Sequence, residues 1–351
     1  MANMAQAIRM ALHYGESQLG VTDIFGEDVG APLGGVFTAT QGLKTAWNSP
    51  LDERGIIGAA IGIAMTGDRC VAEIQFCDYI FNTIDLLKIA GNTHWVTNGN
   101  YHLPMVVMTP VGAGIRGSVY HSHSFDAWAS RLPGWKVVMP SNPRDAYGLL
   151  LAAIKDPNPV LFLKPKALMR VRGEDLIPGE PEDEKTLKAM IDAPVGDRSK
   201  WKPKWPKIED YTVPIGKGAV TRAGQDITVV TYGRHVLMAN QAADILSSEG
   251  VSVEVIDLRS IYPYDWQLIK SSVTKTKRVV FVNEDTEVTN FAEHLVYRVV
   301  QELFYDLYAR PRVVAGKNLP GIGLHASLEE ASVPQVNDII SSIRETLEEV
   351  P

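Results

Sequence analysis

The stretch that decides the fold is residues 50–65, which read PLDERGIIGAAIGIAM. From position 55 to position 65 no residue is charged, and small residues separate the isoleucines. A run of four to eight apolar residues could be a buried strand, but a run of this length favours a buried helix. Each glycine costs a helix about 1 kcal/mol relative to alanine. The glycines at 55, 58 and 62 therefore indicate that another backbone packs closely against this helix.

Glu53 lies at the expected start of this helix, close behind Pro50 and Asp52. The N-terminus of a helix favours the carboxylate anion, whereas burial favours the protonated acid. A glutamate that is balanced in this way can share a proton with a basic ring nitrogen. From these residues alone an alternative stays open, in which Glu53 only offsets the helix dipole.

The composition is ordinary for a globular protein and excludes some classes of partner. Of the 351 residues, 45% are hydrophobic and 21% are charged, and the formal net charge of −7 gives no reason to expect nucleic acid or an anionic membrane. Cys70 and Cys77 have neither a disulfide framework nor metal-ligand spacing, which is typical of a reducing compartment. Because no signal sequence or 20-residue apolar span is visible, we expect a cytoplasmic protein.

Strands alternate with helices along the chain, which predicts an α/β fold whose parallel sheet has helices on both faces. In the first part, the pattern predicts strands at 22–25, 71–76, 104–109 and 160–163 and helices at 4–14 and 143–155. In the second part, it predicts strands at 227–231, 251–256 and 278–283 and helices at 236–248 and 291–304. We expect two α/β domains, at residues 1–175 and 215–351.

Between the two domains, residues 176–214 are rich in proline, lysine and acidic residues, and we interpret them as a linker. Trp201 and Trp205 lie in this segment. Tryptophan is unusual in an unpacked linker, so we expect both side chains to pack against a surface.

Four strings along the chain resemble one known family. They are PLDERG at 50–55, AEIQFCDYIF at 72–81, the glycine loop GGVF at 34–37 with QGL at 41–43, and VIDLRSIYP at 255–263. Together they resemble the β subunit of the thiamin-dependent 2-oxo acid dehydrogenases, and the second string is most similar to the branched-chain member. The resemblance implies a thiamin-pyrimidine-binding domain, a linker and a transketolase-like C-terminal domain.

The resemblance also implies roles for individual side chains. Glu53 would hydrogen-bond the pyrimidine ring nitrogen and favour the imino tautomer, which removes the proton from the thiazolium carbon. Tyr79 would lie against the pyrimidine ring, and His121 would help the lipoyl group to accept the acyl unit. Glu27 matches an acid on the path between paired active sites. On its own residues, Glu27 ends a predicted strand, where it could face a ligand crevice or lie in a solvated turn.

Two positions depart from the family pattern. His123 stands where the family has glutamine, and the string Asn283-Glu284-Asp285 replaces the usual His-Glu. His121 and His123 would share one face of an extended segment and could bind a metal, but no third ligand is apparent, so a zinc site is unexpected. Any role that depends on the family's glutamine or on a histidine at position 283 is therefore in question.

The sequence lacks the Gly-Asp-Gly motif that holds diphosphate and magnesium, since Gly67-Asp68 is followed by Arg69. The resemblance implies that an α subunit holds the phosphate end of thiamin diphosphate with Mg, in a heterotetramer of two α and two β subunits. It also implies a lipoyl acyltransferase core as partner and a 2-oxo acid, branched-chain or pyruvate, as substrate. An acetoin-cleaving dehydrogenase and a non-catalytic paralogue stay open as alternatives.

Related β subunits hold a potassium ion near the end of the first domain, through backbone carbonyls and one acid. By position, the resemblance places this site at Leu103, Met105, Val106, Ala153, Asp156 and Asn158. The end of the helix at 143–155 leaves carbonyl groups unpaired, and Asp156 at that negative pole is unfavourable unless a cation is present. The alternative is a helix end followed by a turn in which Asp156 is solvated.

Overall fold

The computed structural model describes residues 1–194 and 199–349, and the chain divides into two compact units. The first unit contains residues 1–110 and 131–215, and the second contains residues 111–130 and those from 216 onward. The domain limits at residues 175 and 215 stay a prediction, and residues 195–198 of the expected linker lie outside the described residues.

The first unit is built on a parallel sheet whose strands follow the order β5-β6-β4-β3-β1-β2. The bounds are β1 (Val21–Gly26), β2 (Ala46–Asn48), β3 (Arg69–Glu73), β4 (Met105–Val111), β5 (Lys136–Val138) and β6 (Val160–Pro165). Every residue of β4 and of β6 is buried. Strands of parallel sheets are covered on both faces, so their residues need not alternate between apolar and polar. The expected parallel α/β sheet is confirmed.

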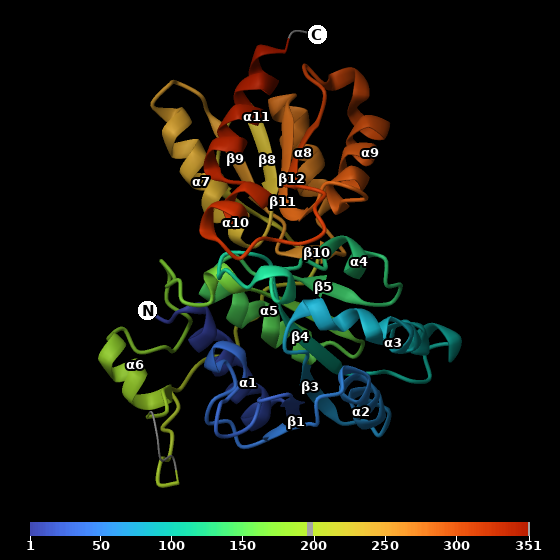
Figure 1. The fold of residues 1–351 in the computed structure, drawn as a ribbon, viewed down its shortest axis with the longest axis vertical. Coiled ribbons are helices and arrows are strands. Elements are labelled where there is room, and N and C mark those ends of the chain that lie inside the picture. Colours follow the sequence, from blue (N-terminus) through green and yellow to red (C-terminus); the bar gives the residue numbers. More distant parts are fainter. Residues whose placement is uncertain (195–198, 350–351) are drawn as a thin grey trace. The chain divides into compact units, whose positions relative to one another are not determined.

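Helices pack in pairs in the first unit. Helix α1 (Met4–Gln18) packs along α5 (Pro143–Lys155), and α2 (Glu53–Met65) packs beside α3 (Ile84–Val96), as Figure 1 shows. Helix α5 has the bounds that the sequence predicts. Its start combines Pro143 at the first helical position with the side chain of Asn142, which accepts a hydrogen bond from the backbone of Asp145. Short 3-10 turns are η1 (Val36–Thr38), η2 (Cys77–Thr83) and η4 (Lys166–Leu168).

The expected linker is packed into the first unit and contains a helix that the sequence pattern did not predict, α6 (Glu184–Ile191). Its apolar residues belong to the core of this unit: Ile177, Leu187, Ile191, Ile208 and Val213. The ring of Trp205 stacks on His13 with centroids 4.0 Å apart. The ring of Trp201 lies against Gly42, where a Cβ atom would clash with it. Both tryptophans therefore pack against a surface, as predicted.

The second unit has its own sheet, in the order β12-β11-β8-β9-β7, which is parallel except for β7. The bounds are β7 (Ala219–Arg222), β8 (Ile227–Thr231), β9 (Val253–Asp257), β11 (Val279–Thr286) and β12 (Arg312–Gly316); β10 (Ser260–Tyr262) lies outside this sheet. Figure 1 shows α7 (Arg234–Ser247) and α11 (Val336–Glu348) on one side of the strands and α8 (Trp266–Thr276) and α9 (Phe291–Leu303) on the other. The shorter helices are α4 (Asp126–Ser130) and α10 (Ala326–Ser332), with 3-10 turns η3 (Ser118–Tyr120) and η5 (Phe304–Asp306).

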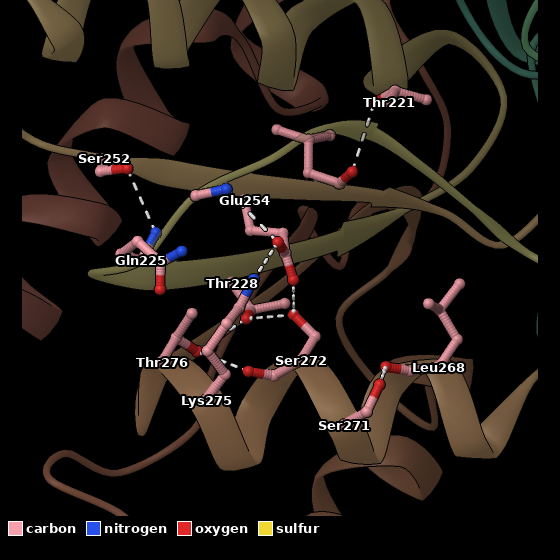
Figure 2. Close-up of polar contacts among 12 residues, drawn as sticks. Thr221, Gln225, Thr228, Ser252, Glu254, Leu268, Ser271, Ser272, Lys275 and Thr276 are labelled. Atoms are coloured by element: carbon pink, nitrogen blue, oxygen red, sulfur yellow. Dashed lines mark hydrogen bonds and ion pairs between the residues drawn. The ribbon is translucent and has the colours of Figure 1, made fainter.

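A buried polar network attaches α8 to the sheet of the second unit (Figure 2). Glu254 on β9 accepts hydrogen bonds from Ser272 and Lys275 of α8. The hydroxyl of Thr228 on β8 lies 2.7 Å from those of Ser272 and Thr276. Burial opposes ionisation of Glu254, but the hydrogen bonds from Lys275 and Ser272 outweigh it and lower the pKa of this carboxyl. Because these polar groups satisfy one another, they specify how α8 packs rather than offering a site.

Candidate functional site

Three of the expected site residues follow three neighbouring strands of the first unit. Glu27 comes directly after β1, Glu53 opens α2 after β2, and Tyr79 lies in η2 after β3. These strands are adjacent in the order β3-β1-β2, and all three run parallel. Ligands of open parallel sheets bind outside the carboxyl ends of the strands. The fold therefore brings Glu27, Glu53 and Tyr79 together at one edge of the sheet.

Helix α2 begins at Glu53, as the sequence predicts, but only one of its faces is buried. Ile56, Ile57, Ala60 and Ala64 are buried, whereas at Gly58 and Gly62 a Cβ would meet no atom of the described residues within 4 Å, apart from the adjoining backbone of α2 itself. The expected close backbone contact at these glycines is therefore not made by the described part of this chain. The glycine face of α2 is open.

The carboxylates of Glu53 and Glu27 form the acidic part of the site. Asn82 donates from Nδ2 to Oε2 of Glu53 at 3.2 Å. Glu27 is 9% exposed, and its Oε1 has no hydrogen-bond partner among the described residues. Burial raises the pKa of Glu27, and the negative charges of Glu53 and Asp28 raise it further. An acid whose pKa is raised keeps its proton closer to neutral pH, which suits a group that transfers protons.

Tyr79 is the aromatic member of the site. Its ring meets that of Phe76 edge to face, with centroids 6.2 Å apart. Burial raises the pKa of the Tyr79 phenol, and the nearby charges of Asp78, Glu27 and Glu53 add to the effect. The phenol therefore stays neutral and presents an aromatic ring beside the two carboxylates.

A buried ion pair that the sequence analysis did not identify supports the glycine loop of this site. Glu73 ends β3, and its Oε1 accepts a hydrogen bond from the backbone N–H of Val36 at 3.1 Å. Its Oε2 pairs with Nζ of Lys164 on β6, and both side chains are fully buried. Acidic and basic residues in two otherwise apolar strands, at 71–73 and 162–164, are the signal that could have revealed the pair.

His121 belongs to the second unit, in the loop that follows β4. It comes directly after η3 and is half-buried, and its backbone N–H donates to the carbonyl of Ser118 at 3.4 Å. The neighbouring His123 accepts a hydrogen bond at its carbonyl from the N–H of Gly112 at 2.8 Å. Within its unit, His121 therefore lies on a loop that is closed by the hydrogen bond between Gly112 and His123.

A cavity of about 260 Å³ lies in the second unit at the carboxyl ends of β11 and β12. Its lining includes His123, Glu284, Asp285, Lys317 and Asn318. The string Asn283-Glu284-Asp285, which departs from the family pattern, thus contributes two acids to this lining. Burial raises the pKa of Asp285, although the backbone N–H groups of Ala127 and Thr286 and the charge of His123 oppose this.

The residues expected to hold potassium lie around the C-terminal end of α5, where Leu103, Met105, Val106 and Ala153 are buried. Asp156 pairs with Lys136 through Oδ2 and accepts the N–H of Asn158 at Oδ1 at 3.0 Å. Arg69 donates from Nη1 to the carbonyl of Ile154 at 2.6 Å. Oδ1 of Asn158 is buried without a hydrogen-bond partner in the described ranges. The charge of Asp156 is therefore compensated by Lys136 within the chain.

Three general findings concern membrane-spanning helices, the cysteines and metal-binding groups. Across residues 1–194 and 199–349, no helix combines the length and the apolar character needed to cross a bilayer. Cys70 and Cys77 are buried thiols that are not joined in a disulfide. Those same residues contain no group of three or more histidine, cysteine, aspartate or glutamate side chains that could hold a metal ion.

Known proteins resemble the chain in sequence and in fold. Residues 1–172 match the model described as transketolase, pyrimidine binding domain, and residues 216–339 match transketolase, C-terminal domain. The 2-oxoisovalerate dehydrogenase subunit beta of Bacillus subtilis is 36% identical over 93% of this chain and 92% of its own. The pyruvate dehydrogenase E1 component subunit beta of Acholeplasma laidlawii is 37% identical over 87% of this chain and 85% of its own. A solved chain titled split gene transketolase, inactive beta4 tetramer, shares the fold with a TM-score of 0.71 at 17% identity, over 100% of both chains.

Proposed function

Because the chain belongs to the family of 2-oxo acid dehydrogenase β subunits, we propose that it is the β subunit of a thiamin diphosphate-dependent enzyme. The enzyme decarboxylates a 2-oxo acid oxidatively, with a branched-chain 2-oxo acid or pyruvate as substrate, and passes the acyl group to lipoyl-lysine. The observation that carries this proposal is the convergence of Glu27, Glu53 and Tyr79 at the ends of three adjacent strands.

The side chains at this edge fit the pyrimidine end of thiamin diphosphate. A carboxylate accepts several hydrogen bonds, so Glu53 can hold a ring nitrogen while it accepts from Asn82. Tyr79 offers an aromatic face to a flat heterocycle. Oε1 of Glu27 is a nearly buried oxygen without a partner among the described residues, as expected beside a polar ligand group.

In this assignment, the chain's own residues hold and move protons around the cofactor. When bound, thiamin diphosphate supplies the carbon nucleophile that attacks the 2-oxo group. Glu53 holds a proton at the pyrimidine ring nitrogen. Glu27, whose pKa is raised by burial and by the charges of Glu53 and Asp28, supplies a second carboxyl group that keeps its proton to a higher pH than an ordinary glutamate does. Burial of Glu27 keeps competing water away from that carboxyl group.

His121 acts in the second half of the reaction, in which the acyl group moves to the lipoyl arm. A histidine can give a proton to the sulfur that leaves the opening dithiolane ring, because an imidazole ring serves as a general acid and base. The position of His121 on the loop after β4, half-buried rather than buried, supports contact with an incoming arm.

An α subunit completes the enzyme and holds the diphosphate with magnesium, in a tetramer of two α and two β chains that binds a lipoyl acyltransferase core. The open glycine face of α2 supports this assignment, because it leaves room for a closely packed partner backbone. The buried thiols of Cys70 and Cys77 are consistent with a cytoplasmic location. Calorimetry on the chain alone should show weak binding of thiamin diphosphate, and tight magnesium-dependent binding would contradict the shared site.

A potassium ion at Leu103, Met105, Val106, Ala153, Asp156 and Asn158 stays part of the proposal. Oδ1 of Asn158, which has no hydrogen-bond partner among the described residues, supports a cation there, whereas Lys136 competes for Asp156. We expect a small rise in Tm when potassium replaces tetramethylammonium, a larger rise in Lys136→Met, and none in Asp156→Ala. Equal Tm values in both salts for all three proteins would exclude the site.

The decisive experiment is a turnover panel on the α–β complex loaded with thiamin diphosphate and magnesium. Pyruvate, branched-chain 2-oxo acids and acetoin are supplied in turn, with ferricyanide as electron acceptor. Turnover of a 2-oxo acid supports the proposal and names the substrate. Turnover of acetoin alone would favour an acetoin-cleaving enzyme. Cofactor binding without any turnover would indicate a non-catalytic paralogue.

A further inference from the structure

Arg9 of α1 joins two segments of the first unit that lie far apart in the sequence. Its side chain is buried, with 2% exposed. Nε and Nη2 donate to the carbonyl of Thr38 at 3.0 and 2.7 Å. Nη1 donates to the carbonyl of Ile191 at 2.9 Å and to Oδ1 of Asp192 at 2.6 Å. A buried guanidinium needs such a carboxylate, because an uncompensated charge in the interior is strongly unfavourable.

The segment that Arg9 holds has an unfavourable backbone conformation. Phe37 and Thr38 have φ values of 59° and 62°, and neither is glycine. A β-branched residue such as threonine rarely adopts a positive φ, so this conformation persists only where the surroundings impose it. The two hydrogen bonds from Arg9 to the carbonyl of Thr38 are contacts that impose it.

The same loop, residues 28–43, begins directly after Glu27 of the candidate site. The N–H of Gly35 donates to the carbonyl of Asp28 at 2.7 Å, and the N–H of Val36 donates to Glu73 at 3.1 Å. Thr38, whose carbonyl accepts from Arg9, is therefore two residues from Val36. Gly35 is hydrogen-bonded to Asp28, which directly follows Glu27. Backbone hydrogen bonds therefore connect Thr38 through Gly35 with Asp28, the residue that follows Glu27.

The expected linker contributes further contacts to this arrangement. Nε2 of Gln6 donates to Oδ2 of Asp192 at 3.2 Å, so both carboxylate oxygens are bound. Trp201 lies against Gly42 in the loop, where the φ of +79° and the lack of a side chain admit the ring. Trp205 stacks on His13 of α1.

We propose that residues 184–192 and 199–205 act as a strap that sets the conformation of the 28–43 loop, and that Arg9 and Asp192 are positioning residues for Glu27. Through Arg9, the carboxylate of Asp192 keeps the guanidinium on the carbonyl of Thr38. The role of Arg9 and Asp192 in positioning Glu27 for proton transfer rests on the proposed function. The role of the strap in ordering the 28–43 loop does not.

The chain offers a matched pair of variants. Asp192 pairs with Arg9 on α1, and Asp210 pairs with Lys155 on α5, each with the two charged atoms 2.6 Å apart. Both aspartates lie in the expected linker, but only Asp192 is connected to the 28–43 loop. Asp192→Asn removes the charge that the strap uses, and Asp210→Asn removes the charge of a more exposed ion pair elsewhere in the expected linker.

Hydrogen exchange with mass spectrometry on the full chain, co-expressed with the α subunit, tests the strap. We expect amides of the 28–43 loop to exchange about tenfold faster in Asp192→Asn, because the hydrogen bond from Arg9 to a charged carboxylate is replaced by a weaker one to a neutral amide. Asp210→Asn should match the wild type, and Asp192→Glu should restore most of the protection. Should Asp192→Asn fail to fold, Trp201→Ala removes a contact to the loop without disturbing a buried charge, and the same increase is expected. If the variant that folds, Asp192→Asn or Trp201→Ala, exchanges its 28–43 amides at the wild-type rate, the strap is overturned.

The pH profile of kcat tests the positioning role. A looser loop admits water beside Glu27, so the acidic limb of the profile should move to lower pH in Asp192→Asn and not in Asp210→Asn. Faster loop exchange with an unchanged profile in an active complex would overturn the positioning of Glu27. If the complex turns over no 2-oxo acid at all, the proposed function fails, and the exchange measurement still decides on the strap.

Discussion

Lys164 and Glu73 form an ion pair in which neither side chain is exposed to solvent. Lys164 lies on β6 and Glu73 on β3, with β4 between the two strands. Glu73 uses its second oxygen to hold the N–H of Val36 in the glycine loop. Each charge therefore depends on the other for compensation, and the loop depends on Glu73.

Replacing only one member of this pair should destabilise the protein strongly. In Lys164→Met the carboxylate of Glu73 is left buried without its counter-ion, and we expect a loss of about 3–5 kcal/mol in the free energy of unfolding. The double variant Lys164→Met/Glu73→Gln carries no buried charge at these positions and should recover most of that loss. Urea denaturation of the three proteins provides the comparison. A double variant as unstable as the single one would show that the pair matters through shape rather than charge.

Glu53→Gln should remove proton exchange at the cofactor while leaving the fold intact. An amide of the same size can still contact Asn82, but it cannot exchange a proton with a ring nitrogen. General acid–base groups contribute about 10²–10⁴-fold, so exchange of the thiazolium C2 proton, followed by NMR in the α–β complex, should slow by that order. Glu293→Gln is the control, because Glu293 is also an acid in the first turn of a helix, α9, but lies outside the candidate site. If Glu53 acted only on the helix dipole, the two variants should behave alike. Wild-type exchange in Glu53→Gln would refute the assignment.

His121→Ala should separate the two halves of the reaction. Decarboxylation measured with ferricyanide should be nearly unchanged, whereas acyl transfer to lipoyl-lysine should fall by about 10²-fold or more, because a proton donor is lost. His123→Ala should have the smaller effect on acyl transfer, since the family has glutamine at this position. Equal losses in both assays for His121→Ala would instead indicate that the histidine maintains the structure of its loop.

Local signals explain which parts of the fold were predictable. Helix α5 matches its expected bounds because Pro143 starts it and the Asp-Pro-Asn-Pro turn from Asp156 stops it, all within one stretch of sequence. Strand β8 also matches, since its apolar residues are buried on both faces. The positions of Glu27, Glu53 and Tyr79 followed from strand ends and family strings, and their chemical roles stay predictions.

Contacts between distant residues explain what the sequence did not reveal. The prolines and lysines around α6 obscured eight residues of helix whose apolar side, Leu187 and Ile191, is buried. Glu73 and Lys164 lie 91 positions apart, so each stands out locally as a charge in an apolar strand, but no local pattern shows that the two are partners. The same holds for Arg9 and Asp192, whose contact requires that the expected linker fold back on α1. Such pairings depend on tertiary packing, which single-sequence periodicity does not encode.

His235 of α7 is a buried histidine with an unusually low affinity for protons. Its Nε2–H points to the carbonyl of Pro334 at 3.4 Å. Burial lowers the pKa of His235 to about 3, and the positive charge of the neighbouring Arg234 contributes. The ordinary pKa of histidine is 6.5, so the unfolded chain binds a proton at this side chain over a range in which the folded chain does not.

The sign of the resulting pH dependence is fixed by this difference. Between pH 6.5 and 3 the unfolded state holds more protons at His235, so acidification through this window favours unfolding. Within this window, His235 lowers the free energy of unfolding by up to about 1.4 kcal/mol for each pH unit of acidification, the value for the uptake of one proton. His235→Gln keeps a hydrogen-bond donor for the carbonyl of Pro334 and cannot titrate. We therefore expect the free energy of unfolding of the wild type to fall relative to that of this variant below pH 6.5. Above pH 6.5 the difference between the two proteins should stay constant. Urea denaturation at several pH values measures the difference. Parallel curves down to pH 4 would mean that His235 protonates in the folded protein.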